Sequence, residues 1–416
     1  MNLKGKKLLV LGSTPQTIDI INYAKNLGVY TIVTDWNDPT KAPVKLAADE
    51  HWEVSLLDYD ELTKRIRENG INGIITGFTD SYLLPYQQLC ELTGLPCYAT
   101  KEVFEVTLDK SKFKQLCIEN DVPTVPAYNL EDFDPSVISP DFKIIIKPVD
   151  NSGSRGIKVC SNSEDFQSCL DYALSFSQKK EVVIERFIEM DNVALCYVIQ
   201  DGEVTLSSMN DRFVHIGETA SACTSASIYP SKYLDFYIQN IDEKVRRMYE
   251  RLGAKNGVLS LGAFTNGSEF YFYEMGYRLT GGRHYIYTNY ENGTNAVEYL
   301  INFAITGNMS DDRISVKENP FFHDYCCKLY ILGKSAQIAR VDGLDYLEKI
   351  PECIKTTLYR NVGDTIGVDG TTAQQIAMVN LIVKDWNRFL EIQKDIREHF
   401  KVFDAEGNDL IIDFMK

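Results

Sequence analysis

The sequence predicts an α/β protein whose chain begins with a parallel β-sheet and continues into one or two further domains. The chain has 416 residues, of which 44% are hydrophobic and 25% are charged. This composition is typical of a globular protein, and the length is sufficient for two or three domains that each bury a core. Over the first 98 residues, short apolar runs alternate with amphipathic stretches. That alternation is typical of βαβ units, and so of a parallel sheet with helices on both faces.

The N-terminal segment contains three expected strands and two expected helices. We expect the strands at residues 8–11, 30–34 and 73–76, and the helices at residues 17–27 and 60–68. Ligands of such sheets bind at the carboxyl ends of the strands, where this chain carries Ser13, Asp35 and Asp80. A dinucleotide is the obvious ligand for such a position, but the sequence lacks the GxGxxG fingerprint of dinucleotide-binding loops.

The overall charge argues against nucleic acid as a partner. The formal net charge is −16 at pH 7, whereas phosphate backbones bind to basic surfaces. The ten cysteines contain no CxxC pair, which is typical of reduced, mostly buried thiols in the cytosol. No apolar run has the length of a signal-peptide core or of a transmembrane helix. We therefore expect a cytoplasmic protein that binds neither nucleic acid nor a membrane.

The remainder of the chain mixes strand and helix patterns. A lysine-rich helix is expected at residues 108–117, before Pro123 and Pro126, because proline lacks a backbone donor and restricts its neighbours. The other expected elements are a helix at 164–176, strands at 181–188 and 194–199 with a turn at Asp201-Gly202, a hairpin of residues 257–264 and 269–275 around Asn266-Gly267, and two strands, 325–332 and 336–341, joined at Gly333-Lys334.

Lys147 follows a short apolar run, residues 144–146, that is expected to be a buried strand. A polar, glycine-containing segment comes next and includes Ser152, Gly153, Ser154, Arg155 and Gly156. Glycine permits backbone conformations that other residues avoid, so such a loop can direct several N–H groups toward one anion while the basic side chains add positive charge. The pattern favours a nucleotide phosphate as the ligand. A hairpin turn that happens to follow a lysine is the alternative, and the spacing is not that of a Walker loop.

A second motif follows the predicted hairpin. Glu274 lies near the end of a strand, and Arg278 follows just before Gly281-Gly282. A carboxylate in this position can hold Mg²⁺, which bridges phosphate oxygens, and an arginine can bind a phosphate or a carboxylate through two hydrogen bonds. The alternative is a surface salt bridge beside a glycine turn.

Taken in chain order, Asp109-Lys110, Lys147 with its loop, the strand at 183–188, and Glu274 with Arg278 resemble the ATP-grasp superfamily of carboxylate–amine and carboxylate–thiol ligases. The nearest branches are the carbamoyl-phosphate-synthase-like and L-amino-acid-ligase-like ones. The resemblance implies a Rossmann-like parallel-sheet domain at 1–98 and a two-lobed ATP-grasp domain at 99–310, with a lid at about 125–188. A small C-terminal α/β domain at 311–416 completes the expected fold.

The resemblance also implies a role for each motif. Lys110 and Lys147 would contact the ATP phosphates, and residues 152–156 would close over them. Glu274 would bind Mg²⁺, and Arg278 would meet the acyl phosphate or the substrate carboxylate. The residues that would line the adenine and the ribose are Glu185, Arg186, Phe187, Ile188 and, as the nearest acid after the hinge strand, Asp191.

Three positions depart from the family pattern. The acid that binds the ribose after the hinge strand has no clear match, and Asp191 is the nearest candidate. The usual Glu-x-Asn-x-Arg reads Glu274-Met-Gly-Tyr-Arg278, and the acid or glutamine expected on the preceding strand falls near residues 260–262, where neither type occurs. The site would then hold magnesium mainly through ATP or through another residue, or it would have lost catalysis.

The segment between the hinge strand and Glu274 helps to form the acceptor pocket in the resembling enzymes. Arg212, His215 and Arg283 are the candidates here for binding a substrate carboxylate, and His215 could also move a proton. The alternative for His215 is a structural role.

The expected function is that of an ATP-dependent ligase. A small carboxylate attacks the γ-phosphate of ATP, and an amine then displaces phosphate from the acyl phosphate. The expected cofactors are ATP and Mg²⁺, the partners are a small-molecule carboxylate and amine, and the resemblance allows a homodimer. Bicarbonate as the carboxylate is a variant of the same hypothesis. Two other classes stay open: a nucleotide-binding protein without catalysis, and a nicotinamide-dependent oxidoreductase that uses the N-terminal domain.

Overall fold

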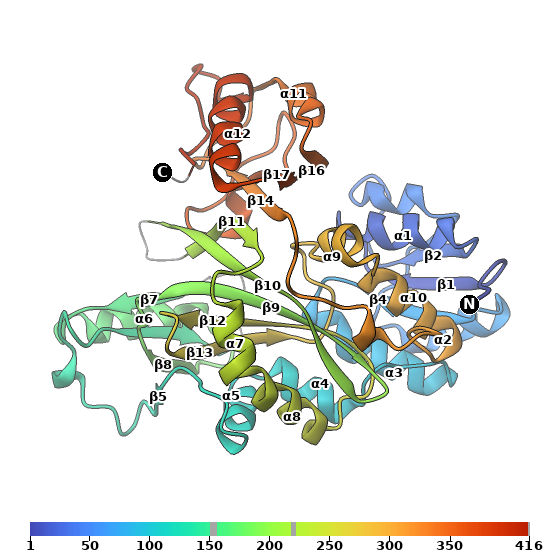
Figure 1. Ribbon diagram of the computed structural model, residues 1–416, viewed down its shortest axis with the longest axis horizontal. Helices are drawn as coiled ribbons and strands as arrows, with labels where there is room; N and C mark the ends of the chain where they lie inside the picture. Colours follow the sequence, from blue (N-terminus) through green and yellow to red (C-terminus); the bar gives the residue numbers. More distant parts are fainter. Residues whose placement is uncertain (150–155, 218–221, 415–416) are drawn as a thin grey trace.

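The computed structural model describes residues 1–149, 156–217 and 222–414. Figure 1 shows a parallel sheet at one end of the molecule, a long antiparallel sheet across the middle, and a smaller sheet at the other end. The C-terminal helices and strands lie at the top of the view, and the C-terminal strands form one end of the long sheet. Among the described residues, no helix combines the length and the apolarity that crossing a bilayer requires.

The N-terminal sheet is parallel, as predicted, with the strand order β3-β2-β1-β4. The expected strands and helices are all present, and β3 and α3 come in addition. The bounds are β1 Lys7–Leu11, β2 Tyr30–Thr34, β3 Glu50–Trp52, β4 Gly73–Thr76, α1 Thr17–Asn26, α2 Tyr59–Glu68 and α3 Leu83–Thr93.

The N-terminal sheet is covered by a helix from much later in the chain. A Cβ at Gly73 of β4 would lie 2.2 Å from the carbonyl oxygen of Ala304, because helix α10 (Ala296–Thr306) approaches the strand that closely. The apolar side chains of α10 belong to the same core as those of β1 and β4. Residues 296–306 therefore pack on the N-terminal domain, although the sequence places them inside the predicted segment 99–310.

The long sheet has eight strands in the order β13-β12-β9-β10-β11-β14-β17-β16. The predicted hairpin around Asn266-Gly267 is confirmed, since β12 and β13 pair antiparallel, and β9 and β10 meet at the predicted turn Asp201-Gly202. The strand bounds are β9 Asp191–Gln200, β10 Glu203–Ile216, β11 Ala222–Tyr229, β12 Gly257–Thr265, β13 Phe270–Gly276, β14 Tyr325–Leu332, β16 Cys353–Leu358 and β17 Gln375–Val383.

The predicted pair of strands joined at Gly333-Lys334 is wrong in its second member. The first strand, β14, pairs with β11 and β17. The backbone N–H of Gly333 donates to Gln374, and that of Lys334 donates to Leu410, so the chain leaves the sheet here instead of turning back. The next strand, β15 (Arg340–Asp342), pairs with β18 (Lys401–Phe403).

The predicted helix at 108–117 is in fact two helices, α4 (Lys101–Leu108) and α5 (Lys110–Glu119). Asp109 separates them, because its carboxylate accepts hydrogen bonds from the backbone N–H groups of Ser111 and Lys112 and so caps α5. The remaining helices are α6 Phe166–Phe176, α7 Leu234–Asn240, α8 Asp242–Leu252, α9 Tyr285–Asn292, α11 Leu344–Lys349 and α12 Trp386–His399, with short 3₁₀ turns at Pro43–Ala47, Asp80–Tyr82, Pro135–Val137, Ile314–Val316 and Thr372–Gln374.

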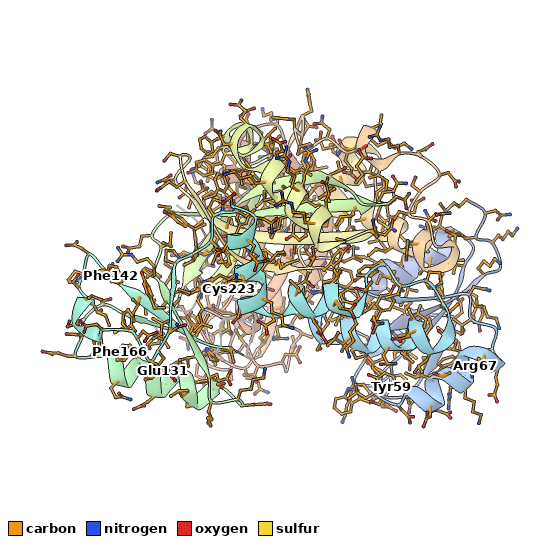
Figure 2. All side chains as sticks on the ribbon, turned by 90° about the horizontal axis from the view of Figure 1, so that it is seen from below. Tyr59, Arg67, Glu131, Phe142, Phe166 and Cys223 are labelled. Carbon is orange, nitrogen blue, oxygen red and sulfur yellow. The ribbon has the colours of Figure 1, made fainter. Side chains whose placement is uncertain are left out.

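A separate four-stranded sheet, with the order β5-β8-β6-β7, forms the end of the molecule far from the N-terminal domain. The four strands are β5 Ala127–Tyr128, β6 Ile144–Pro148, β7 Lys158–Cys160 and β8 Val182–Arg186. Helix α6 covers this sheet, and apolar residues from both form a core of their own. Figure 2 shows Phe142 and Phe166 in this part, far from Tyr59 and Arg67 of the N-terminal domain.

Candidate functional site

A cavity of about 2290 Å³ lies where the four-stranded sheet, helix α5 and the long sheet meet. Side chains of Lys110, Lys147, Arg212, Glu274 and Lys328 line it, and each comes from a different element. Pockets for a single small ligand usually measure about 300–1000 Å³. The cavity is therefore large enough for more than one ligand at a time.

One end of the cavity carries a cluster of three lysines around a single carboxylate. The Nζ of Lys147 lies 2.5 Å from Oε2 of Glu185, and the Nζ of Lys114 lies 2.5 Å from Oε1 of the same carboxylate. The Glu185 side chain is 7% exposed. Burial acts to raise the pKa of Glu185, but the positive charges of the two lysines outweigh it and the pKa is lowered. Glu185 is therefore an ionised partner for two lysines. We call Lys110, Lys114, Lys147 and Glu185 the lysine cluster.

Lys110 is the third cation of the lysine cluster. It occupies the first turn of α5, directly after the capping residue Asp109. Burial lowers the pKa of Lys110, and the positive charge of Lys147 lowers it further. The structure thus brings Lys110 and Lys147 together, as the resemblance implied. The sequence analysis did not single out Lys114, although its spacing of four residues from Lys110 puts both on one face of a helix.

The loop after Lys147 is only partly described. Ser152, Gly153, Ser154 and Arg155 lie outside the described residues, and Gly156 is the first residue after them. Gly156 has φ +77°, and a Cβ there would lie 2.5 Å from the Cβ of Phe176 and 2.7 Å from Pro148. Both the backbone conformation and the close packing therefore require glycine at this end of the loop.

The predicted adenine-lining residues divide into two groups. Glu185, Phe187 and Ile188 line the cavity. The Arg186 side chain does not, since it donates to the carbonyl of Asp141 at 2.6 Å and its guanidinium lies 4.0 Å from the centre of the Phe142 ring. Its contact with Phe142 is a cation–π interaction beside the four-stranded sheet, so we do not include the Arg186 side chain in the site.

Asp191, the candidate for the ribose, lies at the start of β9 and lines the cavity. Its carboxylate accepts a hydrogen bond of 2.5 Å from the Tyr233 hydroxyl and lies 2.8 Å from the ammonium of Lys232. The hydrogen bond from Lys232 is the main cause that lowers the pKa of Asp191.

Glu274 lies on β13, opposite Gly262 of β12, and its side chain is about half exposed. A Cβ at Gly262 would lie 2.8 Å from the Tyr273 hydroxyl and 3.0 Å from the Glu274 side chain. The second acid that the family places on this strand therefore has no room. In the described part of the chain, no three His, Cys, Asp or Glu side chains are arranged to hold a metal. One carboxylate does fit Mg²⁺ that arrives on nucleotide phosphates, because that ion is commonly held by one or two carboxylates plus phosphate oxygens.

Arg212 extends from β10 toward Glu274. Its Nη1 lies 3.5 Å from a carboxylate oxygen of Glu274 and donates a hydrogen bond of 3.2 Å to the Tyr273 hydroxyl. Burial acts to lower the pKa of Arg212, but Tyr273 and Glu274 outweigh it and raise the pKa. Arg212 is thus a permanent positive charge in the cavity.

Arg278 binds a carboxylate of the N-terminal domain. Its Nε and Nη2 donate to the two oxygens of Asp80 at 2.7 and 2.6 Å, and its Nη1 donates to the carbonyl of Leu279 at 3.0 Å. Both Arg278 and Asp80 line the cavity. The two-pronged geometry is the one with which arginine binds carboxylates generally.

His215 and Arg283 do not line the cavity with Arg212. The Nε2 of His215 lies 2.9 Å from an oxygen of Asp369. The Arg283 side chain is 1% exposed; its Nε lies 2.9 Å from an oxygen of Asp19, and its Nη1 donates to Thr357. Both side chains have protein partners away from the cavity, so we leave these two substrate candidates out of the site.

Lys328 is a cavity residue that the sequence analysis missed. It lies in the middle of β14, its residue is 4% exposed, and it lines the cavity. Burial, and after it the positive charge of Arg212, lowers the pKa of Lys328 to about 7. The available signal was a single lysine inside the otherwise apolar strand Tyr325–Leu332. Charged residues are rarely buried without a partner, so this pattern could have been noted.

The N-terminal sheet is poorly suited to a dinucleotide. Asp35, at the end of β2, would have to bind the ribose, but its Oδ1 lies 2.7 Å from the Nζ of Lys45. Both side chains of this pair are buried, and the Ser13 hydroxyl also bonds to Asp35. The carboxylate is therefore already engaged, which disfavours a nicotinamide-dependent oxidoreductase.

Comparison with known proteins gives a family match for the middle of the chain. Residues 109–297 match the family described as the carbamoyl-phosphate synthase L chain, ATP binding domain. Among curated proteins, the chain is similar to the formate-dependent phosphoribosylglycinamide formyltransferases of Bacillus velezensis and Francisella tularensis. The first match is 24% identical over 195 residues, 45% of this chain and 50% of the relative, so it spans only half of that protein. The second is 25% identical over 286 residues, 66% of this chain and 71% of the relative.

Solved structures resemble almost the whole chain. An L-amino acid ligase from Bacillus licheniformis has a TM-score of 0.79 at 15% identity, covering 96% of this chain and 99% of that one. A phosphoribosylglycinamide synthetase from Anaerococcus prevotii has a TM-score of 0.74 at 17% identity, with the same coverage. The biotin carboxylase domain of 2-oxoglutarate carboxylase from Hydrogenobacter thermophilus, solved with MgADP and bicarbonate, has a TM-score of 0.74 at 18% identity, covering 97% of this chain and 91% of that one. Residues 109–297 therefore match the ATP binding domain of the carbamoyl-phosphate synthase L chain, and the chain as a whole has the ATP-grasp fold of these solved structures.

Proposed function

We propose that this protein is an ATP-dependent ligase that joins a small carboxylate to an amine through an acyl phosphate. The observation that carries the proposal is the cavity, in which the lysine cluster lies at one end and Glu274, Arg212 and Arg278 line the same space. The relatives support it, because a formyltransferase that uses formate, an L-amino acid ligase and a carboxylase that binds bicarbonate all handle small carboxylates.

The lysine cluster is the proposed site of the ATP triphosphate. It brings three lysines together beside one carboxylate at a partly buried position. Phosphate oxygens are attracted by the lysine ammonium groups, and the attraction is stronger in a cavity than in bulk water. Phe187 and Ile188 line the neighbouring wall, where the adenine would lie.

Glu274 is the proposed protein ligand of magnesium, with the phosphate oxygens completing the coordination. When bound, the ion neutralises charge on the phosphate oxygens during phosphoryl transfer. The Nη1 of Arg212, which lies 3.5 Å from a carboxylate oxygen of Glu274, helps to hold that carboxylate at the cavity wall.

Arg278 is the proposed residue for the carboxylate substrate and its acyl phosphate. The two N–H groups that now donate to Asp80 are the pair that a substrate carboxylate would accept from. In this role Arg278 holds the reacting carboxylate and stabilises the negative charge that moves onto the phosphate. Closure of the lid over the cavity would keep water away from the acyl phosphate.

A second function is supported by one specific observation. Gly262 leaves no room for the second acid, so the carboxylate of Glu274 has no neighbouring acid on β12. A protein of this fold that binds ATP without hydrolysing or transferring its phosphate would not need a second acid. It would bind ATP with little dependence on magnesium.

Release of phosphate from Mg·ATP in the presence of paired amino acids and other small carboxylates and amines tests both candidates. The ligase releases ADP and phosphate only with a particular pair, and Lys147→Ala abolishes the release. The matched control is Lys143→Ala, since Lys143 pairs with the exposed Glu189 and does not line the cavity. ATP binding without phosphate release from any pair would favour the non-catalytic protein.

A further inference from the structure

Arg212 and Lys328 lie in one row across three adjacent strands. Arg212 of β10 is paired with Ser227 of β11, and Ser227 is paired with Lys328 of β14. Figure 1 shows these strands side by side in the long sheet. Directly paired residues point to the same face of a sheet, and all three of these residues line the cavity. We call this the cation row.

The spacing within the cation row leaves room for a ligand between its two cations. Neighbouring strands are about 4.8 Å apart, so Arg212 and Lys328 start about 10 Å from each other. The residue between them, Ser227, has a small side chain that does not fill the gap. A Cβ at Gly282 would lie 2.5 Å from the Nζ of Lys328, so glycine at this turn makes room for the ammonium itself.

The ammonium of Lys328 is buried and lacks a counter-ion. Across residues 1–149, 156–217 and 222–414, no side chain or carbonyl forms a hydrogen bond or an ion pair with it. Its contacts are the rings of Tyr229 and Tyr330, whose centres lie 5.7 and 5.8 Å away. Burying a charged group without a partner is costly, so a protein that keeps one there usually uses it.

Within the described part of the chain, the titratable groups near Lys328 include one charged group. They are Arg212, Cys196, His284, Tyr229 and Tyr330. Burial raises the pKa of Cys196 to about 12 and lowers that of His284 to about 3, and it raises the pKa of both tyrosines, so these four are neutral near pH 7. Arg212 alone is charged, and it is also a cation.

We infer that Lys328 and Arg212 together bind an anionic group of the acceptor substrate, a carboxylate or a phosphate monoester, in the space above Ser227. Calling this ligand the acceptor substrate rests on the proposed ligase function, in which the lysine cluster binds ATP. Lys328 is the specificity-determining residue, and Tyr229 and Tyr330 form the apolar floor beside the anion. A bound anion also favours the charged form of Lys328, so binding takes up a proton.

Calorimetric titration tests the anion site without any turnover. Ribose 5-phosphate and L-aspartate are titrated at pH 8 into the wild type, Lys328→Met and Lys334→Met, each in two buffers of different ionisation enthalpy. Methionine keeps the length and apolar stem of lysine, and Lys334 is an exposed lysine just beyond β14 that does not line the cavity. We expect one of the two probes to bind the wild type with an uptake of about one proton. Lys328→Met should weaken this binding by about tenfold or more and remove the proton uptake, and Lys334→Met should change neither.

The two probes identify the class of anion. Tighter binding of ribose 5-phosphate indicates a phosphate monoester, and tighter binding of L-aspartate indicates a carboxylate. The inference is overturned if neither probe binds at millimolar concentration, or if Lys328→Met binds both as tightly as the wild type. The ligase proposal fails separately, on the absence of phosphate release. ATP should raise the melting temperature of Lys328→Met as much as that of the wild type, because Lys328 is not part of the lysine cluster.

Discussion

The lysine cluster and the cation row are both basic, but they differ in how their charge is balanced. In the cluster, Glu185 lies 2.5 Å from two lysines and neutralises part of their charge. In the row, the described partners of Arg212 are the half-exposed Glu274 at 3.5 Å and the Tyr273 hydroxyl, and those of Lys328 are aromatic rings. A cluster that already holds a counter-ion folds at little electrostatic cost and, in the proposed function, exchanges partners when ATP binds. The buried ammonium of Lys328 destabilises the fold until a ligand supplies negative charge.

Removing the counter-ion from the lysine cluster should have the largest effect. Glu185→Gln leaves Lys114 and Lys147 uncompensated, and we expect it to lower the free energy of unfolding by about 3 kcal/mol in urea denaturation near pH 7. ATP should recover more stability in this variant than in the wild type, because its phosphates replace the lost carboxylate. Glu189→Gln, which changes an exposed carboxylate paired with Lys143, should stay within about 0.5 kcal/mol of the wild type.

The same carboxylate predicts how the wild type responds to acid. The pKa of Glu185 in the folded protein is lower than its ordinary value of 4.5, so the folded state favours the ionised form. Its contribution to stability is therefore fully present above about pH 4.5 and is lost as the pH falls through the lowered folded-state value. The acid branch of the stability curve should be flatter in Glu185→Gln than in the wild type, and equally steep branches would contradict the ion pairing.

Arg278→Ala should separate turnover from nucleotide binding. We expect the turnover number to fall by about 10- to 100-fold, about 1.4–2.8 kcal/mol of transition-state stabilisation, while the affinity for ATP changes little. Steady-state phosphate release with varied ATP and varied carboxylate measures both quantities. Full turnover in this variant would remove Arg278 from the proposed mechanism.

Lys328→Met should stabilise the protein, in contrast to the loss of Glu185. The pKa of Lys328 is lowered from 10.5 to about 7, so between these values the unfolded state binds more protons than the folded state. Wild-type stability therefore rises with pH from about 7 to 10.5, and the cost of the buried ammonium is greatest below pH 7. The variant should be more stable than the wild type by about 1–2 kcal/mol at pH 6, and this advantage should shrink toward pH 10 in parallel urea titrations. A constant advantage at every pH would mean that lost charge is not the cause.

His215→Ala should have the smallest effect. Its partner Asp369 lies outside the cavity lining, and the pair is partly exposed, so we expect less than about 1 kcal/mol of lost stability and unchanged phosphate release. A loss of turnover of tenfold or more would return His215 to the list of site residues.

The sequence predicted the lysines better than their surroundings. Lys110 and Lys147 could be identified because each follows a recognisable local signal, a capping aspartate and an apolar strand. Partners from distant segments could not be seen: Asp80 of the N-terminal domain holds Arg278 from 198 positions away, and Asp19 holds Arg283. Local patterns encode strands and caps, whereas ion pairs across domains depend on the packing of whole elements.

The fold predictions divide in the same way, into local features that the sequence predicted and long-range pairings that it did not. The parallel sheet and the Asn266-Gly267 hairpin follow from local spacing and turn chemistry, and both are confirmed. The pairing of β14 with β11 and the docking of α10 against Gly73 join segments about 100 and 230 residues apart. Neither pairing leaves a signal in the neighbouring sequence, although Lys328 itself does, as a single lysine inside an apolar strand.

The pairing of β11 with β14 has a consequence for protein engineering. The register from Ala226 opposite Leu329 to Tyr229 opposite Cys326 makes the last quarter of the chain continuous with the long sheet. Chimaeras that graft the C-terminal part of a relative at residue 311 would pair β11 with a foreign strand, which invites mispairing and aggregation. Keeping β11 and β14 from the same parent would preserve this pairing, and with it the relative positions of Ser227 and Lys328.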